Sequence, residues 1–93
     1  GVVNDKLWLK LKPIILDLNI YDKPNLRNIF TGILYRLKTG CPWRYLPECF
    51  GKYNTVFKTF RRWTKLDKFT KIFKQLIKDP DMEWLWCGYG YQG

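Results

Sequence analysis

The sequence predicts an all-α fold, a small domain of four helices. Apolar residues recur every three or four positions in four separate stretches, which is the period of an amphipathic helix. Hydrophobic residues make up 46% and aromatic residues 18% of the 93 positions, enough to build a core in so short a chain. A segment rich in proline, glycine and aromatic rings, residues 39–56 (TGCPWRYLPECFGKYNTV), follows the second stretch and leads into the third. We therefore expect helices two and three to form a helix-turn-helix-like pair joined by a rigid Pro/Trp loop.

The first helix is predicted within residues 4–18. Asn4 is a good N-cap residue, and the apolar positions that follow share one helical face. These positions are Leu7, Trp8, Leu11, Ile14, Ile15 and Leu18. Because Pro13 lacks the amide hydrogen that a helix interior needs, a kink or a break is expected near Lys12.

The second helix is predicted between Asn25 and Gly40. Asn25 can cap its start, and Gly40 can adopt the left-handed conformation in which helices often end. Its apolar positions are Leu26, Ile29, Phe30, Ile33, Leu34 and Leu37. The regularity of this pattern predicts the central core helix.

The loop after this helix is expected to be fixed. Pro42 prevents the helix from continuing, and Trp43 and Leu46 are spaced to fold back onto the core as a single turn. Pro47 and Gly51 are expected to end that turn. Because the large apolar groups would otherwise be left in water, we interpret the loop as a spacer that sets the angle between two helices.

The third helix is predicted to open at Asn54 or Thr55 and to run through NTVFKTFRRWTK. The inward positions are Val56, Phe57, Phe60 and either Trp63 or Thr64. The outward positions form a stripe of cations, Lys58, Arg61, Arg62 and Lys65. Like charges at these spacings cost about 0.2–0.5 kcal/mol per pair. A solvated helix face is the common explanation of such a stripe, but the near absence of acidic partners favours an anionic ligand.

The fourth helix is predicted after Asp67, which can act as its N-cap. The inward positions are Phe69, Ile72, Phe73, Leu76 and Ile77. The outward positions are Lys68, Lys71, Lys74 and Lys78. The sequence Asp79, Pro80, Asp81 is expected to end the helix.

The net charge of +9 is concentrated in one part of the chain. Residues 52–78 carry 9 basic residues and 1 acidic residue, whereas residues 79–93 carry 3 acidic residues and no basic one. Such a density of positive charge indicates a nucleic acid or an anionic membrane surface as partner. No apolar run is long enough to span a bilayer, and no signal peptide is recognisable.

Independent catalysis finds little support in the sequence. Histidine, the usual base for a serine or cysteine nucleophile, does not occur, and no glycine-rich phosphate loop is present. The three cysteines, Cys41, Cys49 and Cys87, form no CxxC pair, so we expect reduced thiols rather than disulfides or a zinc site. We expect no cofactor and no small-molecule substrate for these residues. The expected location is the cytoplasm, in association with the nucleoid.

Double-stranded DNA is the partner that fits the charge pattern best. In a helix-turn-helix the later helix enters the major groove with its N-terminal residues toward the base edges. The candidate residues nearest the bases are Asn54, Thr55, Lys58 and Thr59. The candidates for phosphate or guanine contacts are Arg61, Arg62 and Lys65, and Lys52 with the lysines of the fourth helix would extend the phosphate contacts. Residues 1–80 are thus expected to form a helical DNA-binding domain, and residues 81–93 an extended or disordered tail.

Residues 33–63 (ILYRLKTGCPWRYLPECFGKYNTVFKTFRRW) carry a family resemblance. The hallmark positions, in order, are Gly40, Cys41, Trp43, Arg44, Leu46, Pro47, Gly51, Arg61, Arg62 and Trp63. The segment resembles the N-terminal helical domain of bacterial DDE-type insertion-sequence transposases of the group numbered five. The similarity extends over roughly residues 5–85 and includes KLWLKLKPII and FTKIFKQLIKD.

This resemblance implies a module that recognises transposon ends, placed ahead of an RNase-H-like catalytic domain. That domain would cut and join DNA with three acidic residues and a divalent metal, usually magnesium. Residues 86–93 (WCGYGYQG) contain neither the Asp nor the His expected there, so no catalytic residue is carried over. A truncated or frameshifted copy, or the first reading frame of a split transposase, would explain this, and Gly1 in place of Met also indicates a fragment.

Other functions stay open at this point. The domain could mediate protein contacts, either self-association or binding to a full-length transposase. Its basic amphipathic helices could adsorb to a membrane surface, although the apolar spacing fits a multi-helix core better. A truncated copy could also have no present function.

Overall fold

The computed structural model describes residues 3–80 and confirms the all-α fold. Four helices follow in order: α1 (Asp5–Leu16), α2 (Leu26–Thr39), α3 (Tyr53–Lys65) and α4 (Lys68–Leu76). Between α2 and α3 lie two short 3₁₀ turns, η1 (Trp43–Tyr45) and η2 (Glu48–Phe50). Within residues 3–80 there is no β-strand. The predicted tail, residues 81–93, lies outside the described residues.

The first helix begins as predicted but continues through its proline. The Asn4 side chain caps α1, since its Oδ1 accepts a hydrogen bond of 2.8 Å from the Leu7 backbone N–H. The predicted break near Lys12 is wrong, because α1 is continuous from Asp5 to Leu16 with Pro13 inside it. Pro13 and Leu9, the residue four positions earlier, are both exposed, so water can reach the carbonyl that the proline leaves without a donor.

Gly40 ends α2 as predicted, whereas two of the predicted N-caps are wrong. Gly40 is left-handed (φ 70°), and its N–H donates to the Arg36 carbonyl at 2.8 Å. Neither Asn25 nor Asp67 makes a side-chain hydrogen bond to the start of its helix. Asp67 instead adopts a left-handed conformation (φ 62°), which turns the chain sharply from α3 into α4. The start of α3 at Tyr53 also has no side-chain cap.

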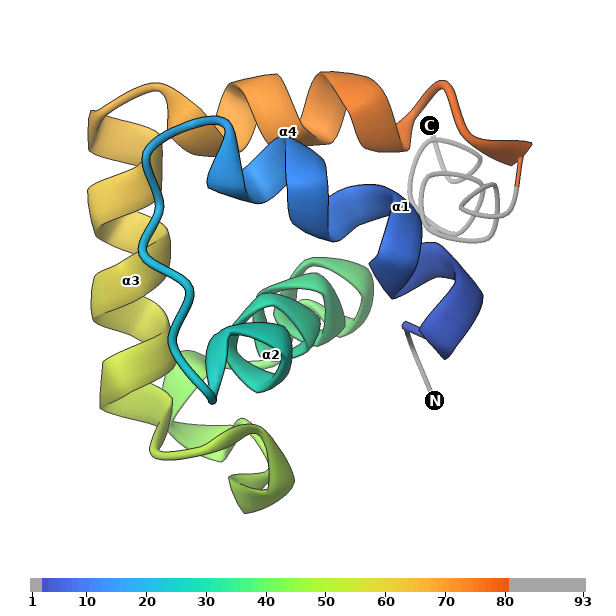
Figure 1. Cartoon of the computed structure of the whole chain (residues 1–93). Coiled ribbons are helices and arrows are strands. Elements are labelled where there is room, and N and C mark those ends of the chain that lie inside the picture. The colour runs from blue at the N-terminus through green and yellow to red at the C-terminus, as the bar shows by residue number, and fades with distance from the viewer. Residues whose placement is uncertain (1–2, 81–93) are drawn as a thin grey trace, which may run out of the picture.

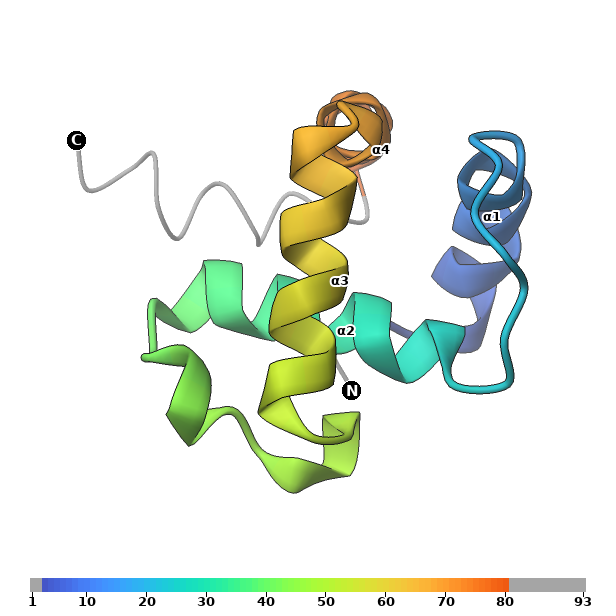
Figure 2. The ribbon, with the colours of Figure 1, turned by 90° about the vertical axis from the view of Figure 1, so that its left-hand side faces the viewer.

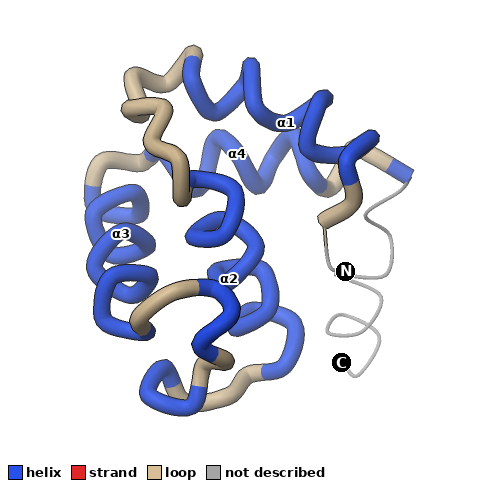
Figure 3. The backbone as a smooth tube through the Cα atoms, turned by 60° about the horizontal axis from the view of Figure 1, so that its bottom comes forward, coloured by secondary structure: helices blue, strands red, loops and turns tan. Residues whose placement is uncertain are grey.

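The helices surround α2 on several sides. In Figure 1, α3 runs along the left edge, α4 crosses the top, and α1 runs below α4 in the opposite direction. After a turn of 90°, α3 stands in front of α2 and crosses it (Figure 2). Figure 3 shows the connection between α2 and α3 at the bottom of the molecule, with its two short turns in blue and the pieces between them in tan, at one end of both helices.

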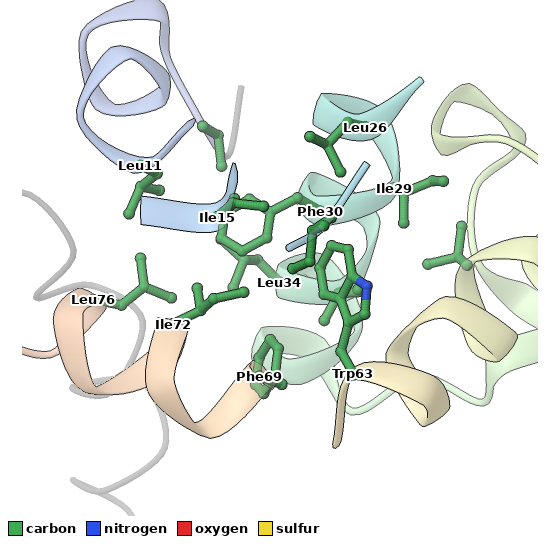
Figure 4. Close-up of a cluster of buried hydrophobic side chains, with 14 of the residues drawn as sticks. Leu11, Ile15, Leu26, Ile29, Phe30, Leu34, Trp63, Phe69, Ile72 and Leu76 are labelled. Carbon is green, nitrogen blue, oxygen red and sulfur yellow. The ribbon is translucent and has the colours of Figure 1, made fainter. Parts of the chain in front are cut away.

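One hydrophobic core joins all four helices (Figure 4). The contributions of α1 are Leu7, Leu11 and Ile15, and those of α2 are Leu26, Ile29, Phe30, Ile33 and Leu34. The contributions of α3 and α4 are Val56, Trp63, Phe69, Ile72 and Leu76. Of the two alternatives in α3, Trp63 faces the core and Thr64 is exposed. The inward prediction for Ile77 is wrong, because this residue follows the last turn of α4 and is 46% exposed.

We call residues 40–52 the elbow, because they connect α2 to α3. The predicted single turn is in fact two successive 3₁₀ turns, one after Pro42 and one after Pro47. The Trp43 ring lies 5.5 Å from the Phe57 ring and 5.4 Å from the Phe60 ring of α3. The Arg36 guanidinium of α2 lies 5.3 Å from the same Trp43 ring, a cation–π contact. The elbow is therefore packed against both helices that it connects.

Gly32 allows α2 to approach the elbow closely. A Cβ atom at this position would lie 2.9 Å from Phe50 Cβ and 3.3 Å from Val56 Cγ1. We expect Gly32→Leu to lower the free energy of unfolding by about 1–3 kcal/mol, because overpacking outweighs the better helix propensity of leucine. Urea denaturation followed by circular dichroism measures this. Asn28→Leu is the matched control, since Asn28 is exposed on the same helix and the change should leave stability equal or higher. Equal behaviour of the two variants would contradict the close packing at Gly32.

Candidate nucleic-acid interface

The outward face of α3 gathers four polar side chains in one line. Asn54, Lys58, Arg61 and Lys65 follow one another at helical spacings of four, three and four, so they project from the same face. All four are exposed. The opposite face of α3 is fixed by Val56 and Trp63, which are buried against the core. In Figure 2 the free side of α3 is turned toward the viewer, and no other described element lies in front of it.

Three further predicted residues lie beside this line. Lys52 is exposed just before α3, and Thr55 and Arg62 are exposed on one flank of the helix. We call these three residues together with Asn54, Lys58, Arg61 and Lys65 the α3 surface.

Thr59, which was predicted to lie near the bases, does not reach the α3 surface. It is only 4% exposed, and its hydroxyl donates to the Thr55 carbonyl at 2.8 Å. A threonine can take an inward helical position in this way, because the carbonyl four residues earlier satisfies its hydroxyl. Thr59 therefore belongs to the packing of α3 and not to its free face.

The cations of α3 are not neutralised by carboxylates within residues 3–80. The ion pairs given by the structure there are Lys10 with Asp79 (3.4 Å), Lys12 with Asp22 (3.3 Å) and Arg27 with Asp5 (2.7 Å). Each of these pairs includes a residue of α1, and none involves a cation of α3. The positive charge of the α3 surface is therefore available to an anionic partner.

The junction of the elbow with α3 includes Arg44, for which the sequence alone left two alternatives open, a phosphate contact or a plain surface position. Two adjoining hollows there, about 550 and 270 Å³, share Arg44, Tyr53 and Asn54 in their linings. Arg44 is exposed and lies next to the start of the α3 surface. Its place was hard to predict because it depends on how the two 3₁₀ turns fold back. Glu48 also lines the larger hollow, so the charge there is mixed.

Metal binding and membrane insertion find little support among residues 3–80. No three His, Cys, Asp or Glu side chains come together there in a way that could hold a metal ion. Cys41 is half-buried and Cys49 exposed, and both are free thiols. In the same part of the chain, no helix has the length and apolar character needed to cross a membrane.

Comparison with known proteins points to one family. The family model described as "Putative transposase of IS4/5 family" matches residues 3–73. The uncharacterized protein y4sN of Sinorhizobium fredii is 30% identical over 63 residues, which is 68% of this chain. The matched region is 50% of that relative, so the chain spans about half of its length. No solved structure matches.

Proposed function

Because the chain belongs to the IS4/5 transposase family, we propose that it binds double-stranded DNA as the N-terminal part of a transposase. Its role in DNA transposition would be recognition of the transposon ends, without cleavage by these residues. Cutting and joining would then require a catalytic domain with a divalent metal, usually magnesium. We further propose that the protein acts in the cytoplasm, at the nucleoid.

One observation carries this proposal: the α3 surface is cationic, exposed and without carboxylate partners in the described chain. Grouped cations repel one another, so the face is costly for the isolated protein. A DNA duplex carries a dense row of phosphates and would remove that repulsion on binding. The elbow supports the proposal indirectly, because it fixes the position of α3 relative to α2 through Trp43.

The proposed orientation places α3 in the major groove, which is wide enough to admit a helix. Asn54 lies near the N-terminal end of α3, where its amide could pair with an adenine edge. Arg61 could pair with a guanine or a phosphate, and the lysines would contact phosphates. The helix-turn-helix character of α2, the elbow and α3 is part of this proposal.

The salt dependence of binding tests the proposed function. If the protein neutralises four to six phosphates, the logarithm of the association constant should fall with the logarithm of salt concentration at a slope of roughly −4 to −5. Fluorescence anisotropy with labelled duplexes, including the inverted repeats of the element, measures this slope. Absence of binding at low salt, or a flat response to salt, would contradict the proposal.

Light scattering of the free protein tests the competing role in self-association. Charge reversal of Arg61 and Arg62 should leave that association intact.

A further inference from the structure

A second cationic site lies on one flank of α3, between the α1–α2 connection and the start of α4. The structure has a pocket of about 190 Å³ there. It is lined by Asn19, Ile20, Tyr21, Lys23, Leu26, Ile29, Thr59, Arg62, Trp63 and Lys68. Figure 2 shows the α1–α2 connection descending beside α3, on the right of the view. We call this the flank pocket.

Three cations from three different segments line the flank pocket: Lys23 before α2, Arg62 of α3 and Lys68 at the start of α4. None of the described lining residues carries a carboxylate. The nearest acidic neighbours in sequence are Asp22, which pairs with Lys12 at 3.3 Å, and Asp67, which is exposed and is not part of the lining. The positive charge around the pocket is thus left uncompensated by the residues that form it.

One of the three cations, Lys68, has hydrogen-bond donors left for a ligand, whereas the hydroxyl of Thr59 has none. The Lys68 ammonium donates one hydrogen bond of 3.3 Å to the Asn19 carbonyl, which leaves two further N–H donors. The Thr59 hydroxyl is used by the Thr55 carbonyl. Lys68 is also the first residue of α4, whose N-terminal amides have no side-chain cap and add positive potential.

These features fit a tetrahedral oxyanion. A volume of about 190 Å³ admits a group the size of a few water molecules. Three cations around so small a space repel one another, and an anion between them would turn repulsion into charge-assisted hydrogen bonds. The guanidinium of Arg62 can bind two oxygens of such a group at once.

We propose that the flank pocket binds a phosphate group, and that the natural source is a backbone phosphate of the bound duplex. This proposal rests on the proposed function. Arg62 belongs both to the α3 surface and to the flank pocket. A strand that passes along α3 would therefore meet Lys23 and Lys68 on that flank. The α1–α2 connection would then contact DNA as well as α3.

The test uses Lys23→Gln, Lys68→Gln and the double variant in duplex DNA binding at several salt concentrations. Glutamine removes the charge but keeps a polar side chain with a hydrogen-bond donor. Because both lysines would serve one phosphate, the double variant should make the salt slope less steep by about 0.9 in total, and weaken binding about eightfold at 0.1 M salt. Lys6→Gln is the matched control, an exposed lysine on α1 whose change should leave binding within about twofold.

A second arm titrates the protein with inorganic phosphate and follows the Trp63 indole N–H by NMR, assigned with Trp63→Phe. Weaker DNA binding of the double variant, with a salt slope that is less steep by about 0.9 in total, supports the DNA phosphate as ligand. A phosphate-dependent shift that the double variant abolishes, with DNA binding unchanged, supports a phosphate pocket but overturns its DNA source. The proposal is overturned if neither arm shows an effect. It is also overturned if the salt slope of the double variant becomes less steep by about twice 0.9, because the two lysines would then serve separate phosphates. The proposed function still stands in that case if Lys58→Gln weakens DNA binding.

Discussion

Replacing Lys58, Arg61 and Lys65 together by glutamine is expected to weaken duplex DNA binding by about 500-fold at 0.1 M salt. Each phosphate that is no longer neutralised lowers the logarithm of the association constant by about 0.9 at that concentration, and its slope against salt becomes about 0.9 less steep. The three residues lie on one exposed line of α3 without carboxylate partners among residues 3–80. Fluorescence anisotropy over a range of salt concentrations measures both quantities.

The fold should survive this triple change. All three side chains are exposed, and their removal relieves repulsion of about 0.2–0.5 kcal/mol per like-charged pair. Thermal unfolding should therefore occur at an equal or higher temperature than in the unchanged protein. Lys6 is another exposed helical lysine, so Lys6→Gln removes the same charge as Lys58→Gln. Comparing the DNA binding of these two variants separates a local contact from a general effect of net charge. Equal losses from these two lysines would show that α3 is not the binding face.

Trp63→Ala is expected to lower the free energy of unfolding by about 3–5 kcal/mol. The Trp63 side chain is 2% exposed and points into the cluster formed by residues of α2 and α4 (Figure 4). Its removal would leave a cavity where three helices meet, in a protein whose total stability is expected to be only about 5–15 kcal/mol. Urea denaturation followed by circular dichroism measures the loss.

Two controls separate loss of packing from loss of an aromatic ring as such. Trp63→Phe keeps a ring in the cavity and should cost less than the alanine change. Tyr45→Ala removes a ring that is 70% exposed and should change stability by no more than about 0.5 kcal/mol. A small effect of Trp63→Ala, similar to that of Tyr45→Ala, would contradict the central place of Trp63 in the core.

Periodicity alone was sufficient to predict the helices and most of the core, because burial of an apolar stripe decides both. The apolar positions from Leu26 to Leu34 in α2 were all correctly expected to face inward. The ends of the helices were harder to predict, since a cap depends on backbone geometry as well as residue type. Asn4 caps α1, but Asn25 does not cap α2. Pro13 failed as a break signal because packing of α1 on the core outweighs one missing hydrogen bond.

The candidate site was predictable only in part, because helical spacing shows which residues share a face but not which distant segments meet. Charge and helical spacing place Lys58, Arg61 and Lys65 on one face without any structure. Thr59 was expected near the bases from its polar side chain and its place early in the helix. Its spacing of three from Val56 and four from Trp63 puts it on the inward face, and the structure buries it with its hydroxyl satisfied. The flank pocket could not be predicted, because Lys23 and Lys68 are far apart in sequence and meet only through the fold.

The way in which neighbouring elements pack has a consequence for folding. The most extensive backbone contacts join α2 with η2 and α3, and α3 with η1, η2 and α4, all within residues 26–76. Contacts over short sequence separations require little loop closure, so this part of the chain is expected to fold rapidly. The core side chains of α1, by contrast, share a cluster with Leu76 at the end of α4. During synthesis α1 leaves the ribosome before the other three helices, yet its apolar face gains its complete set of partners only after α4 has followed.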